Sequence, residues 1–104
     1  MFDFRSHEIL AYNHPVDMRK SFRGLLGEVG SEIKMNPLSK IVFMFFNKRK
    51  NYLKLLFWDR TGYCLICKKL EGGSFNLPSE ESVQSLDLEK INLIFDGIKL
   101  GKRS

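Results

Sequence analysis

The sequence predicts an α+β domain, in which an antiparallel β-meander of three to five strands packs with a helix from the N-terminal half and a C-terminal helix. Three observations support this prediction. Apolar segments separated by short turn sequences follow one another over residues 41–77. Apolar side chains recur at helical spacing in residues 18–33 and again in residues 88–95. The length of 104 residues suits one domain spanning residues 1–104, and a hydrophobic fraction of 43% can form a core.

The N-terminal half is predicted to form a strand and then a helix. The apolar run Ile9–Tyr12 predicts a short strand, which ends before Pro15. Asp17 is a favourable helix N-cap, and the following helix is expected to end near Lys34. Its apolar stripe consists of Met18, Phe22, Leu25, Leu26, Val29 and Ile33.

Three glycines lie within this predicted helix, at positions 24, 27 and 30. Each costs about 0.5–1 kcal/mol relative to alanine in a helix interior. We therefore expect the helix to pack closely against the sheet on its glycine side. Close contact with a ligand or a partner is the alternative.

The second half is predicted to contain the meander and a final helix. Strands are expected at residues 41–46, 52–58 and 63–70, with a short edge strand at residues 75–77. Residues 79–85 are expected to be a polar loop. Asp87 is a suitable N-cap for the last helix, which Gly97 would close. Its core face comprises Leu88, Ile91, Ile94 and Phe95.

Charge is unevenly distributed along this half of the chain. Residues 48–70 contain seven lysines and arginines but one acidic residue, whereas residues 71–96 contain six acidic residues and one lysine. The formal net charge of the whole chain is +5. Lys48, Arg49 and Lys50 form the predicted tip of the hairpin between the first two meander strands. Such an exposed cationic cluster is typical of a surface that meets a polyanion.

Nucleic-acid contacts are therefore predicted for cations of the first helix start, the hairpin and the third meander strand. Cations at a helix start interact unfavourably with the helix dipole, and this unfavourable placement favours a role in binding phosphate. The alternative is that Asp17 and nearby loops compensate the positive charges. Lys54 is expected on an exposed sheet face with Tyr52 and Trp58, although burial of Trp58 under a second layer is favoured. The predicted contacts are Arg19, Lys20, Arg23, Lys48, Arg49, Lys50, Lys54, Lys68 and Lys69.

Three ordered segments of the chain carry a family resemblance. The first segment is Asp17-Met18-Arg19-Lys20 with Phe22 and Gly24-Leu25. The second begins at Phe45, continues through Asn47-Lys48-Arg49, Lys54, Leu56, Trp58-Asp59, Gly62, Leu65, Lys68-Lys69-Leu70-Glu71, Gly73 and Phe75, and ends at Pro78. The third is Phe95-Asp96-Gly97-Ile98. In this order they resemble the small accessory protein encoded by the second reading frame of bacterial insertion sequences of the sixty-six family, often called TnpB. The resemblance covers about residues 12–100.

The resemblance implies a role in DNA transposition and DNA recombination, beside a separate and larger transposase that carries the catalytic acids. It transfers no catalytic residues. Taken with the charge pattern, it predicts a non-enzymatic accessory protein that binds DNA and assists the transposase. The alternative is a protein-interaction module that docks on the transposase through the acidic 71–96 stretch and the last helix, without contacting DNA.

The residues favour neither metal nor cofactor chemistry. Cys64 and Cys67 have a Cys-x-x-Cys spacing, but no second pair completes a zinc site, and thiols three apart on a strand diverge. A small nuclease using His14, Asp17, Asp59 and Glu71 is a weaker hypothesis, because turn and cap roles already explain its acids. The N-terminus resembles no targeting peptide and no apolar run is long enough to span a bilayer, so a cytoplasmic location is expected.

Overall fold

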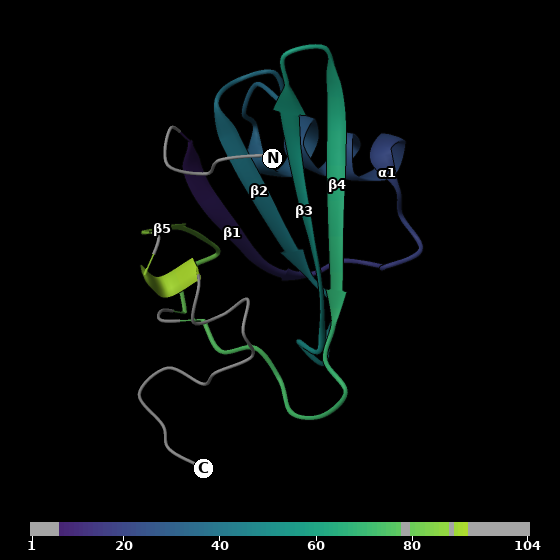
Figure 1. Cartoon of the computed structure of the whole chain (residues 1–104), viewed down its shortest axis with the longest axis vertical. Helices are drawn as coiled ribbons and strands as arrows, with labels where there is room; N and C mark the ends of the chain where they lie inside the picture. The colour runs from purple at the N-terminus through teal and green to yellow at the C-terminus, as the bar shows by residue number, and fades with distance from the viewer. Residues whose placement is uncertain (1–6, 78–79, 88, 92–104) are drawn as a thin grey trace.

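The computed structural model describes residues 7–77, 80–87 and 89–91. A five-stranded sheet in the order β4-β3-β2-β1-β5 forms the centre of this part of the chain (Figure 1). In chain order, the elements are β1 (Glu8–Pro15), α1 (Phe22–Gly27), the π-helix η2 (Glu28–Ile33), β2 (Ile41–Phe46), β3 (Tyr52–Asp59), β4 (Gly62–Lys69) and β5 (Val83–Leu86). The predicted α+β class is confirmed.

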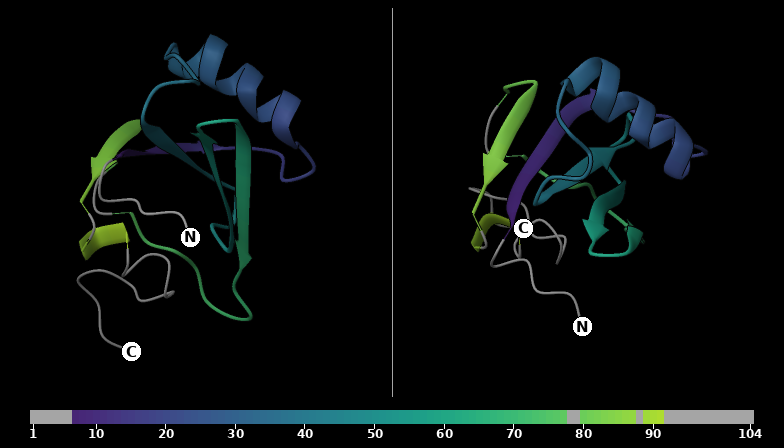
Figure 2. Two further views of the ribbon diagram at one scale, coloured as in Figure 1. Left: turned by 45° about the horizontal axis from the view of Figure 1, so that its top comes forward. Right: turned by 90° about the horizontal axis from the view of Figure 1, so that it is seen from above.

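The predicted meander is confirmed for β2, β3 and β4, which pair antiparallel in sequence order. Strand β1 instead pairs parallel to β2, in a register that runs from Glu8 beside Ile41 to Tyr12 beside Phe45. A parallel pair needs a crossover connection, and α1 and η2 supply it. Figure 2 shows the two helices lying together over one face of the sheet. The sheet is therefore mixed rather than wholly antiparallel.

Strand β5 corrects the prediction for the region after the meander. Residues 83–86 pair antiparallel with β1, although residues 79–85 were expected to be a polar loop. Residues 75–77 form no strand; Phe75 is buried, and its N–H donates to the carbonyl of Lys50 at 2.6 Å. The short β5 segment is half polar, so its strand character comes from pairing with β1 and not from a strong local pattern.

The first helix begins later than predicted. Ser21, and not Asp17, occupies the N-cap position of α1. The carboxylate of Asp17 instead accepts the backbone N–H of Arg19 at 2.9 Å, and the N–H of Lys20 bonds to the Asp17 carbonyl at 3.0 Å. This local turn competes with helix formation. The predicted end is confirmed, because Lys34 adopts a left-handed conformation with φ 62° directly after η2.

The glycines of this helix do not make the close sheet contact that we expected. A Cβ atom at Gly27 or Gly30 would meet no atom within 4 Å, and both residues are exposed. A Cβ at Gly24 would lie 2.9 Å from Cγ of Lys20, a flexible side chain and not the sheet. The glycine side of the helix therefore faces away from the sheet.

Both faces of the sheet are buried along the middle of strands β1, β2 and β3. The helix face packs a cluster of Leu10, Tyr12, Val16, Leu25, Val29, Ile41, Phe43, Phe45 and Leu56. The opposite face packs Ile9, Ala11, Val42, Met44, Phe46, Leu53, Leu55, Phe57, Phe75, Leu86 and Ile91. Strand β2 contributes to both clusters, and all six of its residues are buried. This burial explains why β2 is apolar throughout.

The predicted C-terminal helix is described only at its start. Residues 89–91 are helical, and Asp87 acts as the expected cap, because its side chain accepts the N–H of Lys90 at 2.8 Å. The remainder of that predicted helix, to Gly97, lies outside the described residues. Within the described ranges, no helix has the length and apolar character needed to cross a membrane.

Candidate nucleic-acid interface

The tip of the β2–β3 hairpin is held in shape by one asparagine side chain. Asn47 Oδ1 accepts the backbone N–H groups of Asn51 and Tyr52 at 3.0 and 3.1 Å. Asn47 Nδ2 donates to Asn51 Oδ1 at 2.6 Å, and the N–H of Lys50 bonds to the Asn47 carbonyl at 3.1 Å. The predicted hairpin is confirmed. Its cations therefore project from an ordered loop.

Replacing Asn47 with alanine is expected to destabilise this loop. Three side-chain hydrogen bonds disappear, and the partly buried backbone N–H groups of Asn51 and Tyr52 lose their acceptor. The free energy of unfolding should therefore fall by about 1–3 kcal/mol. Chemical denaturation of the variant and of the wild type measures the difference. Ser39→Ala is a matched control, because it removes a single side-chain bond from another loop, to the Asn36 carbonyl. Equal effects of the two substitutions would contradict the role given to Asn47.

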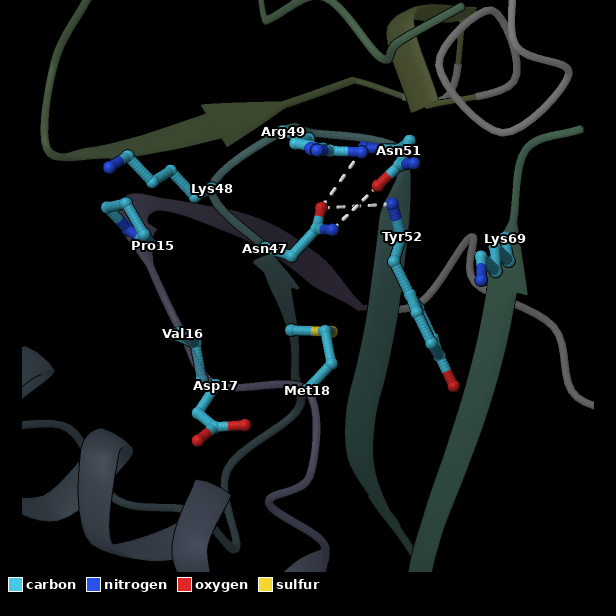
Figure 3. A pocket seen from close by; sticks show the side chains of 10 residues that line it. All are labelled: Pro15, Val16, Asp17, Met18, Asn47, Lys48, Arg49, Asn51, Tyr52 and Lys69. Atoms are coloured by element: carbon cyan, nitrogen blue, oxygen red, sulfur yellow. Dashed lines mark hydrogen bonds between the residues drawn. The ribbon is translucent and has the colours of Figure 1, made fainter. Parts of the chain in front are cut away.

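A surface pocket of about 570 Å³ lies beside this loop. Lys48 and Arg49 of the hairpin tip, Tyr52 at the start of β3 and Lys69 at the end of β4 line it, with Lys48 beside Pro15 and Lys69 beyond Tyr52 (Figure 3). Residues 15–18 form one side of the pocket. The N–H of Val16 donates to the Phe46 carbonyl at 2.9 Å, which fastens this segment beside the hairpin.

An ion pair occupies the 15–18 side of the pocket. The Arg19 guanidinium binds the Asp17 carboxylate through Nε at 3.1 and 3.0 Å and through Nη2 at 2.6 Å. Hydrogen bonds from the Arg19 side chain and backbone lower the pKa of Asp17 to about 2, and the same hydrogen bond raises the pKa of Arg19. Asp17 therefore remains a carboxylate at neutral pH. Arg19, predicted to contact DNA, already faces an internal anion.

The second predicted helix-start cation is also paired. Lys20 Nζ donates to Glu28 Oε1 of η2 at 2.7 Å, and this hydrogen bond raises the pKa of Lys20. Arg23, the third, is an exposed residue of α1. Asp17 thus compensates Arg19, as the alternative interpretation expected, and Glu28 of η2 compensates Lys20.

The predicted exposure of Lys54 is wrong. Lys54 is only 6% exposed, and its Nζ donates to the carbonyl oxygens of Met18 and Lys20 at 2.8 and 2.7 Å. Its ammonium also lies 5.9 Å from the centre of the Tyr52 ring. The segment that connects β1 with α1 covers this part of the sheet face, so the ammonium is satisfied by backbone and is not available to DNA.

The other predicted cations divide between the two sides of the sheet. Lys69 reaches the pocket, but Lys68 lies on the opposite face, because successive side chains of a strand alternate. Lys50 has φ 55° and lines a different pocket, with Phe75 and Glu80. Of the nine predicted contacts, the pocket thus brings together Lys48, Arg49 and Lys69.

Trp58 lies at the far end of β3 from this pocket. It is half-buried, and its ring packs edge-on against Tyr63 with 4.9 Å between the ring centres. Trp58 therefore does not share one exposed surface with Lys54 and Tyr52, as the hypothesis of a base-stacking face required.

The residues considered for metal or catalytic chemistry lie apart from one another. Cys64 is half-buried and Cys67 is exposed, and both lie on β4, where a strand was predicted. His14 Nε2 lies 3.0 Å from Ser82 Oγ, and Asp59 ends β3. Over residues 7–77, 80–87 and 89–91, no three His, Cys, Asp or Glu residues are grouped closely enough to hold a metal ion.

Sequence reasoning missed the pocket residues that carry no charge. The two asparagines that bracket the cations, Asn47 and Asn51, were a usable signal, because asparagine side chains commonly stabilise turns. The 15–18 wall had no such signal. Long-range contacts bring it to the hairpin: the pairing of β1 with β2, the Val16–Phe46 hydrogen bond and the Lys54 bond to the Met18 carbonyl.

Comparison with known proteins identifies a family and relatives that match most of this chain. The model of the family described as "IS66 Orf2 like protein" matches residues 7–104. The chain is 32% identical to the uncharacterized protein y4jC of Sinorhizobium fredii over 95 residues, which cover 90% of this chain and 81% of the relative. It is 38% identical to the uncharacterized protein y4hO of the same organism over 65 residues, or 62% of this chain and 56% of the relative. No solved structure shows a significant match.

Proposed function

Because this chain belongs to the IS66 Orf2-like family, we propose that it is a non-catalytic accessory protein of DNA transposition that contacts the DNA backbone through Lys48, Arg49 and Lys69. The family assignment confirms the resemblance of the three sequence segments and supplies the process. The DNA contact and the assistance to a transposase are our inference from the pocket and its charges.

The observation that carries the proposal is the convergence of three cations on one pocket. Lys48 and Arg49 come from the hairpin tip and Lys69 from β4, so distant parts of the sequence meet there. In the part of the chain that the structure describes, none of the three is engaged in an ion pair. Their charges are therefore free to meet phosphates.

These contacts position DNA without selecting a sequence. Lysine and arginine contacts with phosphate carry no base information, and they supply most of the non-specific affinity of DNA-binding proteins. The element-encoded transposase would then provide the catalysis and site choice, and this protein would help to assemble the protein–DNA complex.

A salt series tests the proposal. Fluorescence anisotropy with labelled duplex and single-stranded DNA should show binding that weakens as salt rises. Three phosphate contacts predict a slope of log K against log salt of about −2 to −3. Absence of binding at low salt, or a slope near zero, would rule out the proposed backbone contact.

Exposed apolar side chains favour a second candidate function, docking on the transposase without DNA contact. Phe22 at the start of α1 is 41% exposed, and Met35 and Leu38 after η2 are 37% and 53% exposed. A contiguous patch of such side chains commonly marks a protein contact. Co-purification with the transposase that survives nuclease treatment, in a chain that shows no DNA binding, would favour this candidate.

A further inference from the structure

We infer that the pocket beside the hairpin accepts an unpaired nucleotide, so that the DNA bound there is single-stranded or locally opened. This inference rests on the proposed function and specifies the form of its ligand. It starts from the mixed lining of the pocket, which joins cations, one aromatic ring, apolar side chains and a single carboxylate.

The aromatic wall is Tyr52. Its side chain extends along the pocket, with Met18 across from it (Figure 3). The buried ammonium of Lys54, 5.9 Å from the ring centre, helps to hold the ring in place. Single-strand-binding proteins use such rings to stack bases beside a cationic groove, because every base has a π-face.

The charges give a bound nucleotide one orientation. Lys48, Arg49 and Lys69 attract a phosphate to the rim formed by the hairpin tip and the end of β4, whereas the charge of Asp17 on the 15–18 side is already compensated by Arg19. The base is thereby directed toward Tyr52 and Met18. A carboxylate at that position can also accept a hydrogen bond from a base amino group.

Duplex DNA matches this lining poorly. Its base faces are stacked inside the helix, so it offers phosphates, sugars and groove edges. A volume of about 570 Å³ has room for a base, and a phosphate site alone needs no aromatic ring or apolar wall. The pocket therefore suits a base that has left the stack.

The test compares Tyr52 variants on matched DNA forms. Tyr52→Ala and Tyr52→Leu remove the π-face, the second while keeping apolar bulk, and Tyr52→Phe retains it. Affinities are measured by anisotropy for a short single strand, for the same strand with abasic sites, and for its duplex. Melting temperatures of all variants, and their duplex affinities, report whether the fold is intact.

We expect the wild type to bind the single strand more tightly than the duplex and to lose affinity for the abasic strand. Tyr52→Ala and Tyr52→Leu should each weaken single-strand binding by about 5- to 150-fold, with duplex binding changed by less than about twofold. Tyr52→Phe should bind as the wild type does.

Any of three results would overturn the inference but not the proposed function: duplex binding at least as tight as single-strand binding, equal affinities for the abasic and the intact strand, or equal losses in Tyr52→Phe and Tyr52→Ala. A wild-type chain that binds neither form at low salt overturns the proposed function, and the inference with it.

Discussion

Replacing Lys48, Arg49 and Lys69 together with glutamine is expected to lower the affinity for single-stranded DNA by about 100-fold at about 0.1 M salt. The three cations line one pocket, and each neutralised phosphate contributes about 0.7 to the salt slope on a single strand. The triple variant should therefore lose about two units of slope. Anisotropy titrations of wild type and variant over the same salt series measure both quantities.

A control variant with the same net charge separates local contact from general attraction. Lys34, Lys40 and Arg60 are exposed; Lys40 precedes β2 and Arg60 follows β3, so both lie at the ends of these strands away from the hairpin. Their replacement with glutamine also removes three positive charges. The control should change affinity only a few-fold, through long-range attraction that salt screens. Similar losses in the two triple variants would show that the pocket has no special role.

The second large effect is expected on stability, from Lys54→Met. Methionine keeps the apolar stem of the lysine but removes the ammonium that binds the Met18 and Lys20 carbonyls. Two charge-assisted hydrogen bonds are lost, and two partly buried carbonyls lose their donor. Part of this loss is offset, because the variant no longer buries the charged ammonium. The free energy of unfolding should fall by about 2–4 kcal/mol. Chemical denaturation measures it.

Lys69→Met is the matched control for this substitution. Lys69 lies on the neighbouring strand and is exposed, so its replacement should change stability by less than about 0.5 kcal/mol. Hydrogen exchange adds a local measurement. The N–H of Lys20, bonded to the Asp17 carbonyl, should exchange faster in Lys54→Met. Unchanged stability together with unchanged exchange would show that Lys54 does not fasten the segment between β1 and α1.

The hairpin and its cationic tip could be predicted because their signals are local. Two apolar runs flank a short polar loop, and the loop residues need only solvent and each other. The same local logic placed Asp87 as a helix cap. It failed for Asp17, because a nearby arginine competes for its carboxylate, and this competition is set by geometry and not by residue type.

The predicted exposure of Lys54 is wrong for a different reason. Strand alternation shows which side chains share a face, but it does not show what covers that face. Here the segment that leads into α1 covers the face. Lys54 contacts Met18 and Lys20 of this segment, which are separated from it in sequence by 36 and 34 positions. The parallel pairing of β1 with β2 and the pairing of β5 with β1 are likewise long-range, and neither leaves a strong pattern in the local sequence.

The contact through Lys54 joins two of the segments on which the family resemblance rests. Asp17-Met18-Arg19-Lys20 belongs to the first segment and Lys54 to the second. In the structure, the lysine fastens the backbone of the first segment beside the hairpin, which completes the 15–18 side of the pocket. The resemblance thus includes residues that build the pocket and residues that would contact DNA.

The most direct test of the account is an NMR titration of the ¹⁵N-labelled chain with a short single-stranded oligonucleotide at low salt. Amide shift changes are expected to concentrate at residues 16–18, 47–49, 51, 52 and 69, which line the pocket. Changes centred instead on the opposite end of the sheet, around Leu38, Trp58 and Arg60, or an absence of changes at any site, would contradict it.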